Sequence, residues 1–387
     1  MDFAFTESQQ AVVAAAAEVL DRGRAPDQGF ETQGFEAHWK ELSQAGLLAL
    51  ALPDWLGGDG LSVLDTAVLL TELGRRAEPG PALATLMLGV LPVTRWADHD
   101  VQRVLLSGVA TGDTLLTAAV REPSDPMPLV PATTAILAAG PAADGSAADG
   151  PAADGPAAGD PGAALGTVSG TKIGVAYCAE ARWVLVPASF VGGGCGVVIV
   201  DPAAPGVTVL RTPSSAGDPE YTLRLNQAPI GHLLSPRLDG RDIADLYRLA
   251  LAGACCLADG ALAGALALTT AHVGSREQFG RPLATFQAVA QQIADISITA
   301  RTLHLATLSA CWRLDTGLDA GGDLDVAAYW LAEHGPPALR ACHHLHGGLG
   351  MDVSYPLPRY SALIKDLVRF TGGTDYRLDA LAARVCD

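Results

Sequence analysis

The chain has 387 residues, of which 49% are hydrophobic and 17% are charged, and this composition indicates a globular protein with a large core. Its net charge of −17 argues against a nucleic-acid groove or an anionic membrane surface as partner. The seven cysteines are an odd number without a C-x-x-C pair, which favours reduced thiols over a disulfide framework or a zinc site. The opening MDFAFTESQQAVV does not resemble a signal peptide, so we expect a cytoplasmic protein.

The first region, residues 1–115, is predicted to be helical. Thr6 can cap the first helix, with Gln9 as its capping-box partner. Helical patterns continue through HWKELSQAGLLAL and LSVLDTAVLLTELGRRA, and the turn LPDWLGGDG separates the two. We therefore expect an N-terminal helical domain.

The middle region, residues 116–236, has the pattern of strands. The β-branched runs RWVLVPAS, CGVVIVD, GVTVLRT and YTLRLNQ are separated by Gly and Pro, which is typical of a small antiparallel β domain. Within it, residues from about 140 to 163 form a degenerate Ala/Gly/Pro/Asp-rich repeat that is too poor in apolar bulk to pack. We interpret this repeat as a disordered loop.

Helical patterns return in residues 237–387, so the fold class is α+β, in the order helical, β, helical. Leu249 to Leu268 is almost entirely apolar apart from Asp259, and its small residues favour a tightly packed internal helix over a membrane span. A second helix, predicted from about residue 284 to 313, carries one apolar stripe. The stripe consists of Phe286, Val289, Ile293, Ile296, Ala300 and Leu303.

The residues that precede this second helix are not explained by its stripe. Arg276, Gln278 and Phe279 gather just before the turn Gly280-Arg281-Pro282. An arginine, an amide and an aromatic ring are suited to a ligand that is planar and anionic. The chain has no G-x-S-x-G elbow, no H-E-x-x-H and no Walker loop. An organic cofactor is therefore favoured.

No metal site is predicted. His343, His344 and His346 lie close together in sequence, but no carboxylate or thiol has the spacing to complete a site with them.

Several segments together resemble the flavin-dependent acyl-CoA dehydrogenase family over nearly the whole chain. They are MDFAFTESQQ, LGGDGLSVLDTAVLLTELGR, SREQFGRPLATFQAVAQQIAD and HLHGGLGMDVSYPLPRY. The third is similar to the most specific signature of the family, an Arg-x-Gln-Phe-Gly turn followed by Phe-Gln and a helix. The fourth is similar to its Gln-x-x-Gly-Gly-x-Gly segment.

The resemblance implies that FAD is the cofactor and that the Arg-x-Gln-Phe turn reaches the ADP half of a neighbouring subunit's FAD. Arg276 would pair with the pyrophosphate, Phe279 would pack near the dinucleotide and Gln287 would hydrogen-bond to it. The other residues that the resemblance assigns to the cofactor are Gln278, Gly347, Gly348 and His344, the last of which replaces the glutamine of the family. The two glycines would let backbone N–H groups approach the phosphates.

The resemblance also implies that the catalytic base is absent. The family reaction removes the α-proton of an acyl-CoA thioester with a carboxylate. Thr371, or Gly372 if the alignment shifts by one residue, and Ala250 occupy the two positions at which relatives carry this carboxylate. The segments that line the flavin ring are also altered, to REPSD at Arg121–Asp125 and to SGTKIGVAYCAEA.

This combination resembles the base-less subunits of heteromeric bacterial dehydrogenases that shorten steroid side chains. In these assemblies a homologous chain carries the base in an α2β2 complex with shared FAD. An acyl-CoA substrate and such a partner are therefore expected. Two alternatives stay open. One is a self-sufficient flavoenzyme with altered chemistry, such as an oxidase, a dehydratase or a biosynthetic dehydrogenase, which would be a homotetramer. The other is a flavin-free scaffold.

Overall fold

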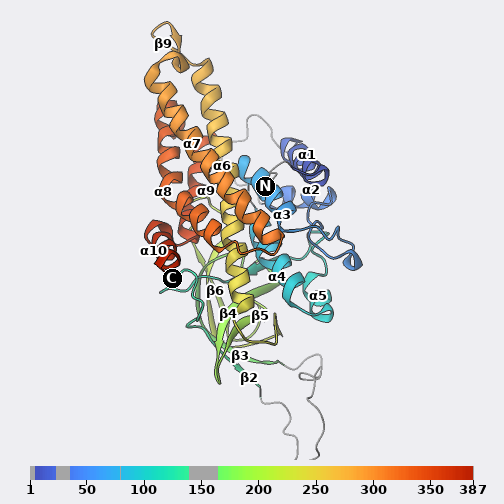
Figure 1. The fold of residues 1–387 in the computed structure, drawn as a ribbon. Helices are drawn as coiled ribbons and strands as arrows, with labels where there is room; N and C mark the ends of the chain where they lie inside the picture. The colour runs from blue at the N-terminus through green and yellow to red at the C-terminus, as the bar shows by residue number, and fades with distance from the viewer. Residues whose placement is uncertain (1–4, 23–34, 79, 139–163, 387) are drawn as a thin grey trace, which may run out of the picture.

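The computed structural model describes residues 5–22, 35–78, 80–138 and 164–386 (Figure 1). Helices come first along the chain, followed by a β-sheet and then by a second set of helices, which confirms the predicted fold class. The division into domains at residues 116 and 237 stays a prediction, and the loop expected at about 140–163 lies outside the described residues.

The N-terminal helices begin as the sequence predicts. The Thr6 N–H donates to Gln9 Oε1 over 3.1 Å and the Gln9 N–H donates to Thr6 Oγ1 over 3.3 Å, so the predicted capping box is confirmed. The elements of this region are α1 Glu7–Arg22, α2 Glu36–Gln44, η1 Asp54–Leu56, α3 Val63–Arg75, the π-helix η2 Leu83–Val90, α4 Leu91–Trp96 and α5 His99–Leu106.

An eight-stranded sheet forms the middle of the protein, and its strand order is β6-β7-β3-β2-β4-β5-β8, with β1 paired to β4. The strands are β1 Leu116–Ala118, β2 Thr134–Leu137, β3 Gly166–Ala176, β4 Trp183–Phe190, β5 Cys195–Val200, β6 Val207–Thr212, β7 Glu220–Pro229 and β8 His232–Leu233. Most neighbouring strands are antiparallel, as predicted, whereas β1 and β2 run parallel to β4.

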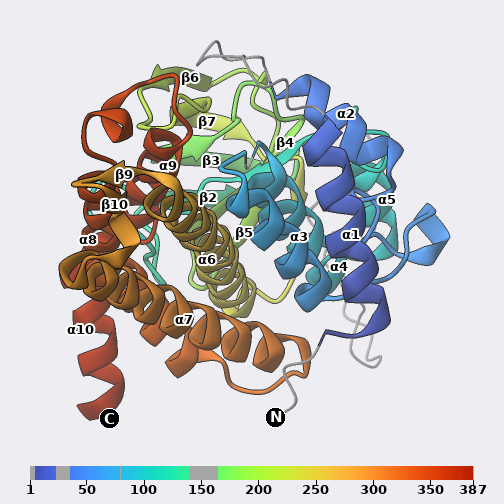
Figure 2. The ribbon, with the colours of Figure 1, turned by 90° about the horizontal axis from the view of Figure 1, so that it is seen from above.

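The C-terminal helices form a bundle around α6. The helices are α6 Arg241–Ser275, α7 Gln287–Asp315, α8 Gly321–His346, α9 Leu357–Phe370 and α10 Gly373–Cys386. Short elements join them, namely β9 Glu277–Gln278, β10 Arg281–Pro282, η3 Leu283–Thr285 and η4 Gly347–Met351. Seen from above, α6 lies between α3 on one side and α7 and α8 on the other (Figure 2).

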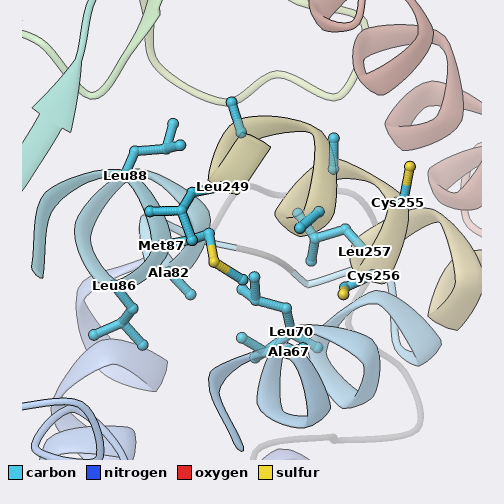
Figure 3. Packing of buried hydrophobic residues seen from close by; sticks show 14 of the residues in the cluster. Ala67, Leu70, Ala82, Leu86, Met87, Leu88, Leu249, Cys255, Cys256 and Leu257 are labelled. Atoms are coloured by element: carbon cyan, nitrogen blue, oxygen red, sulfur yellow. The ribbon is translucent and has the colours of Figure 1, made fainter. Parts of the chain in front are cut away.

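The small residues of α6 explain why this apolar helix is internal. A Cβ on Gly260 would lie 1.9 Å from the Thr71 carbonyl oxygen, and one on Gly264 would lie 2.1 Å from the Arg75 carbonyl oxygen. The backbones of α3 and α6 are thus in direct contact, and buried apolar side chains of both helices pack around them (Figure 3). Although α6 is long and apolar enough to span a membrane, 89% of its most apolar window is buried inside the protein.

Candidate functional site

The turn between α6 and α7 projects from one end of the bundle (Figure 1). Gln278 pairs with Arg281 in the two-stranded β9–β10 hairpin, whose loop residues Phe279 and Gly280 have φ angles of 56° and 77°. Two residues with positive φ are what a type I′ hairpin loop requires. For Phe279 this conformation costs about 1 kcal/mol or more, and its side chain is nevertheless 91% exposed. The hairpin therefore holds an aromatic ring out into solvent.

The predicted cofactor residues of this turn all lie on its surface. Arg276 ends α6 with an extended backbone, and its carbonyl accepts the Leu283 N–H over 2.9 Å, which closes the turn. The side chains of Arg276, Gln278 and Gln287 are exposed, and Gln287 is the first residue of α7. The structure thus gathers an arginine, two amides and a ring on one exposed tip, which we call the α6–α7 tip (residues 276–287).

The glycine segment lies next to the last turns of α6. Gly347 ends α8 with φ 60° and ψ −136°, a conformation that favours glycine, and a Cβ on Gly347 or Gly348 would meet open space. The His346 ring stacks on the His272 ring of α6 with centroids 4.4 Å apart, one turn before Arg276. This stacking places the Gly-Gly segment and the start of the α6–α7 tip at the same end of the bundle.

The three histidines around this segment have different roles. His344 is exposed on the last turn of α8. His343 is held by the Gly350 carbonyl at 2.8 Å and by the Ser361 hydroxyl at 2.6 Å. His346 is buried, and burial is the main cause that lowers its pKa; its Nε2 atom has no hydrogen-bond partner. Within the described parts of the chain, no group of three or more His, Cys, Asp or Glu side chains could hold a metal ion.

Thr371 and Ala250 are both fully buried. Thr371 caps the C-terminus of α9, and its hydroxyl donates to the Val368 carbonyl over 3.0 Å. The buried Arg377 guanidinium donates to the Thr371 carbonyl. Ala250 lies within α6 among the apolar residues of the core. Neither residue can accept a proton from carbon.

The two carboxylates near the start of α6 are bound by other groups. Asp245 accepts hydrogen bonds from the Arg95 guanidinium and the Trp96 indole, each over 2.8 Å. Asp242 accepts the Val197 N–H over 2.9 Å. Burial raises the pKa of Asp242, partly offset by its backbone hydrogen bonds. Asp245 and Asp242 therefore position α4 and the sheet against α6.

The two carboxylates of the REPSD segment are also bound. Glu122 accepts the Lys172 ammonium over 2.8 Å and the Thr133 hydroxyl over 2.6 Å, and Lys172 is completely buried. Burial lowers the pKa of Lys172 to about 8, although Glu122 raises it in part. Asp125 accepts the Tyr376 hydroxyl over 2.9 Å. Glu122 thus joins the segment to β3, and Asp125 joins it to α10.

Two arginines, the half-buried Arg121 and the buried Arg377, were missed by sequence reasoning. Arg121 lies over Gly174, where a Cβ would be 2.9 Å from its Nη1 atom, and burial lowers its pKa. Arg377 is 3% exposed and lies between Thr371 and Met127. The signal for Arg121 was its place in REPSD, but nothing local in the sequence indicates that Arg377 turns inward.

Two models of known protein families match the chain. The model of the acyl-CoA dehydrogenase N-terminal domain matches residues 6–113, and that of the acyl-CoA dehydrogenase C-terminal domain matches residues 246–386. The chain belongs to the acyl-CoA dehydrogenase family. It is 41% identical to acyl-CoA dehydrogenase FadE28 of Mycobacterium tuberculosis (strain ATCC 25618 / H37Rv), over 99% of both chains. It is 29% identical to FadE27 of the same organism, over 100% of this chain and 99% of that protein.

Solved structures show the same fold. A variant of the Tcur3481-Tcur3483 steroid ACAD has a TM-score of 0.84 and 31% identity, and the match covers 98% of both chains. The ChsE4-ChsE5 complex from Mycobacterium tuberculosis has a TM-score of 0.86 and 26% identity, covering 100% of this chain and 99% of that one. An FAD complex of PigA has a TM-score of 0.82 and 21% identity, and the match covers 100% of this chain and 99% of that one. At this identity the likeness supports the fold alone.

Proposed function

We propose that this chain is the non-catalytic subunit of a heteromeric, FAD-dependent acyl-CoA dehydrogenase that introduces an α,β double bond into an acyl-CoA thioester. The proposal rests on the residues found at the two positions where relatives carry the catalytic base. Thr371 and Ala250 are buried and cannot accept a proton, while Asp242, Asp245 and Glu122 are bound by other groups. A general base contributes roughly 10²–10⁴-fold to rate, so a partner subunit must supply it.

The residues present fit one half of FAD and not the other. The exposed Arg276 can donate to phosphate oxygens, and the open space at Gly347 and Gly348 leaves room for a phosphate to approach the backbone. In contrast, Arg121 lies directly over Gly174 in the segment that lines the flavin ring in relatives. We therefore assign the ADP half to the α6–α7 tip and the glycine segment, and the ring to the partner. FAD, when bound, supplies the acceptor for the hydride.

The partner is proposed to be a homologous, base-bearing subunit in an α2β2 assembly. Support comes from two similar structures whose names give two components, one of them called a steroid ACAD. A steroid side chain is accordingly the proposed acyl group. A cytoplasmic location is supported by the burial of α6 inside the protein and by the free thiols of the described cysteines.

Expression of the chain alone and with a base-bearing homologue tests the proposal. The isolated chain should retain little FAD after gel filtration and should not reduce an artificial electron acceptor with any acyl-CoA. The co-expressed complex should be yellow and active, and should hold fewer flavins than chains. Turnover by the isolated chain would refute the proposal in favour of a self-sufficient homotetramer. A flavin-free complex would favour a scaffold.

A further inference from the structure

Two thiols outside the site face each other across the α6–α7 interface. Cys256 on α6 and Cys311 on α7 have their Sγ atoms 3.5 Å apart, and each side chain is 1% exposed. Cys255, the neighbour of Cys256, is also fully buried. Because successive helical residues point about 100° apart, Cys255 is directed away from the line between the other two sulfurs.

We propose that Cys256 and Cys311 are a modification site, at which a hydroperoxide forms a reversible disulfide that joins α6 to α7. A disulfide bond is about 2.05 Å long, so the two sulfurs need to approach by only about 1.5 Å. Rotation about χ1 moves each sulfur relative to its own backbone and can contribute to this approach. Disulfides in a reducing compartment are usually transient, which is in keeping with a reversible bond.

The reaction balances with the peroxide as its only oxidant. One thiol loses its proton and its sulfur attacks an oxygen of the peroxide, so that an S–O bond forms, the O–O bond breaks and the leaving oxygen departs as water or alcohol. The second sulfur then attacks the sulfenic sulfur, so that the S–S bond forms and the S–O bond breaks with loss of water. The two thiols give up two electrons in total, and the peroxide accepts them.

In the resting protein the pair is reduced. The hydrogen bond to Cys311 and burial both raise the pKa of Cys256, so little thiolate is present at neutral pH. The nearby titratable groups Asp259 and His304 share a hydrogen bond of 2.8 Å across the same interface. Each of these two side chains is thus bound to the other.

The bond would have a structural consequence for the α6–α7 tip. Cys256 and Cys311 are 55 positions apart in the chain, and the ring closed by their bridge contains all of residues 276–287. Cross-links that close long rings stabilise a protein chiefly by restricting its unfolded state. The oxidised chain should therefore melt at a higher temperature than the reduced chain. This inference holds whether or not the chain has the function proposed above.

The test uses the purified wild-type chain. After exposure to hydrogen peroxide, free thiols are alkylated and a non-reduced digest is analysed by mass spectrometry. We expect a cross-linked peptide pair joining the segments of Cys256 and Cys311, the loss of two titratable thiols, and a rise in melting temperature, all reversed by dithiothreitol. Met351, which is 73% exposed, reports that the peroxide has acted. Retention of both thiols after Met351 is oxidised would overturn the proposal, as would conversion of either to sulfinic acid.

A matched pair of variants identifies the bond. Cys255→Ser should keep the cross-link, whereas Cys256→Ser should abolish both the cross-link and the rise in melting temperature. A cross-link that survives in Cys256→Ser and is lost in Cys255→Ser would assign the bond to Cys255 and so contradict the proposal. If either variant fails to fold, the wild-type peptide map alone decides whether Cys311 is joined to this segment.

Discussion

Replacing Arg276 by alanine gives a direct test of the α6–α7 tip, because the fold does not depend on this side chain. The contacts that shape the turn at this position are made by the backbone: the Arg276 N–H donates to the His272 carbonyl over 2.8 Å, and its own carbonyl accepts from Leu283. The guanidinium is exposed. An exposed substitution of this kind changes the free energy of unfolding by about 0.5 kcal/mol or less, so Arg276→Ala should fold and assemble normally.

The expected effect on FAD follows from the single contact that is lost. A hydrogen bond to a charged group contributes about 1.5–3 kcal/mol, and every ~1.4 kcal/mol is a factor of ten in the dissociation constant. The affinity of the assembled complex for FAD should therefore fall by about 10- to 100-fold. Arg276→Lys should fall in between, since an ammonium keeps the charge but not the planar fork of donors.

The assay is a titration of the flavin-stripped complex with FAD, followed by flavin fluorescence. Arg248→Ala is the matched control, because Arg248 is also an exposed arginine of α6 and lies near the opposite end of that helix. The control should bind FAD like the wild type. An unchanged affinity in Arg276→Ala, or an equal loss in Arg248→Ala, would refute the assignment of Arg276 to the phosphates.

Three further predictions concern the interior. Lys172→Met should lower the free energy of unfolding by about 3–5 kcal/mol in a denaturant titration, because Glu122 stays buried without its cation, and a loss below ~1 kcal/mol would contradict this. Burial raises the pKa of Glu122, but its bonds from Lys172 and Thr133 lower it overall below its ordinary 4.5. The charged Glu122 therefore stabilises the fold above pH 4.5, and this stabilisation is lost as the pH falls through the lower pKa that Glu122 has in the folded state. Glu122→Gln should accordingly flatten the acid limb of a plot of the free energy of unfolding against pH. Thr371→Glu should not confer acyl-CoA turnover on the isolated chain, since the new carboxylate would lie beside the buried Arg377 guanidinium and would be held there; turnover close to that of the complex would show otherwise.

Local patterns predicted the secondary structure well because their causes are local. The runs RWVLVPAS and CGVVIVD became β4 and β5, and the pairing of Thr6 with Gln9 is made within one helical turn. The start of α7 was placed too early. Residues 283–285 form a 3-10 turn and Phe286 is extended, so the helix begins at Gln287. The apolar stripe alone could not reveal this, because Phe286 is the extended N-cap residue of α7 and its ring contacts Phe279 and Arg281 of the tip.

The partners of the buried polar groups could not be predicted, because they come from distant parts of the chain. The role of Asp245 became clear only from Arg95 and Trp96, which lie about 150 positions earlier and hydrogen-bond to it through the tertiary fold. The inward direction of Arg377 depends likewise on the placement of α10 against α9 and on the carbonyl of Thr371. Whether residues on the α6–α7 tip bind FAD stays a prediction.

Groups that hold the fold are separate from groups that would serve the cofactor, which explains how the chain can keep the family architecture with no carboxylate at Thr371 or Ala250. Lys172 and Glu122 join β3 to the segment that follows β1, and the glycines of α6 allow its contact with α3; neither feature involves the positions of Thr371 or Ala250. At Thr371 the loss of the carboxylate leaves a helix cap whose hydroxyl and carbonyl are both hydrogen-bonded, so the substitution leaves no orphaned polar atom there. The exposed ring of Phe279 has the opposite character, because it adopts a strained backbone and gains no burial within its own chain. The proposed assembly predicts that this ring packs against a ligand or another subunit, and such packing would compensate the backbone strain.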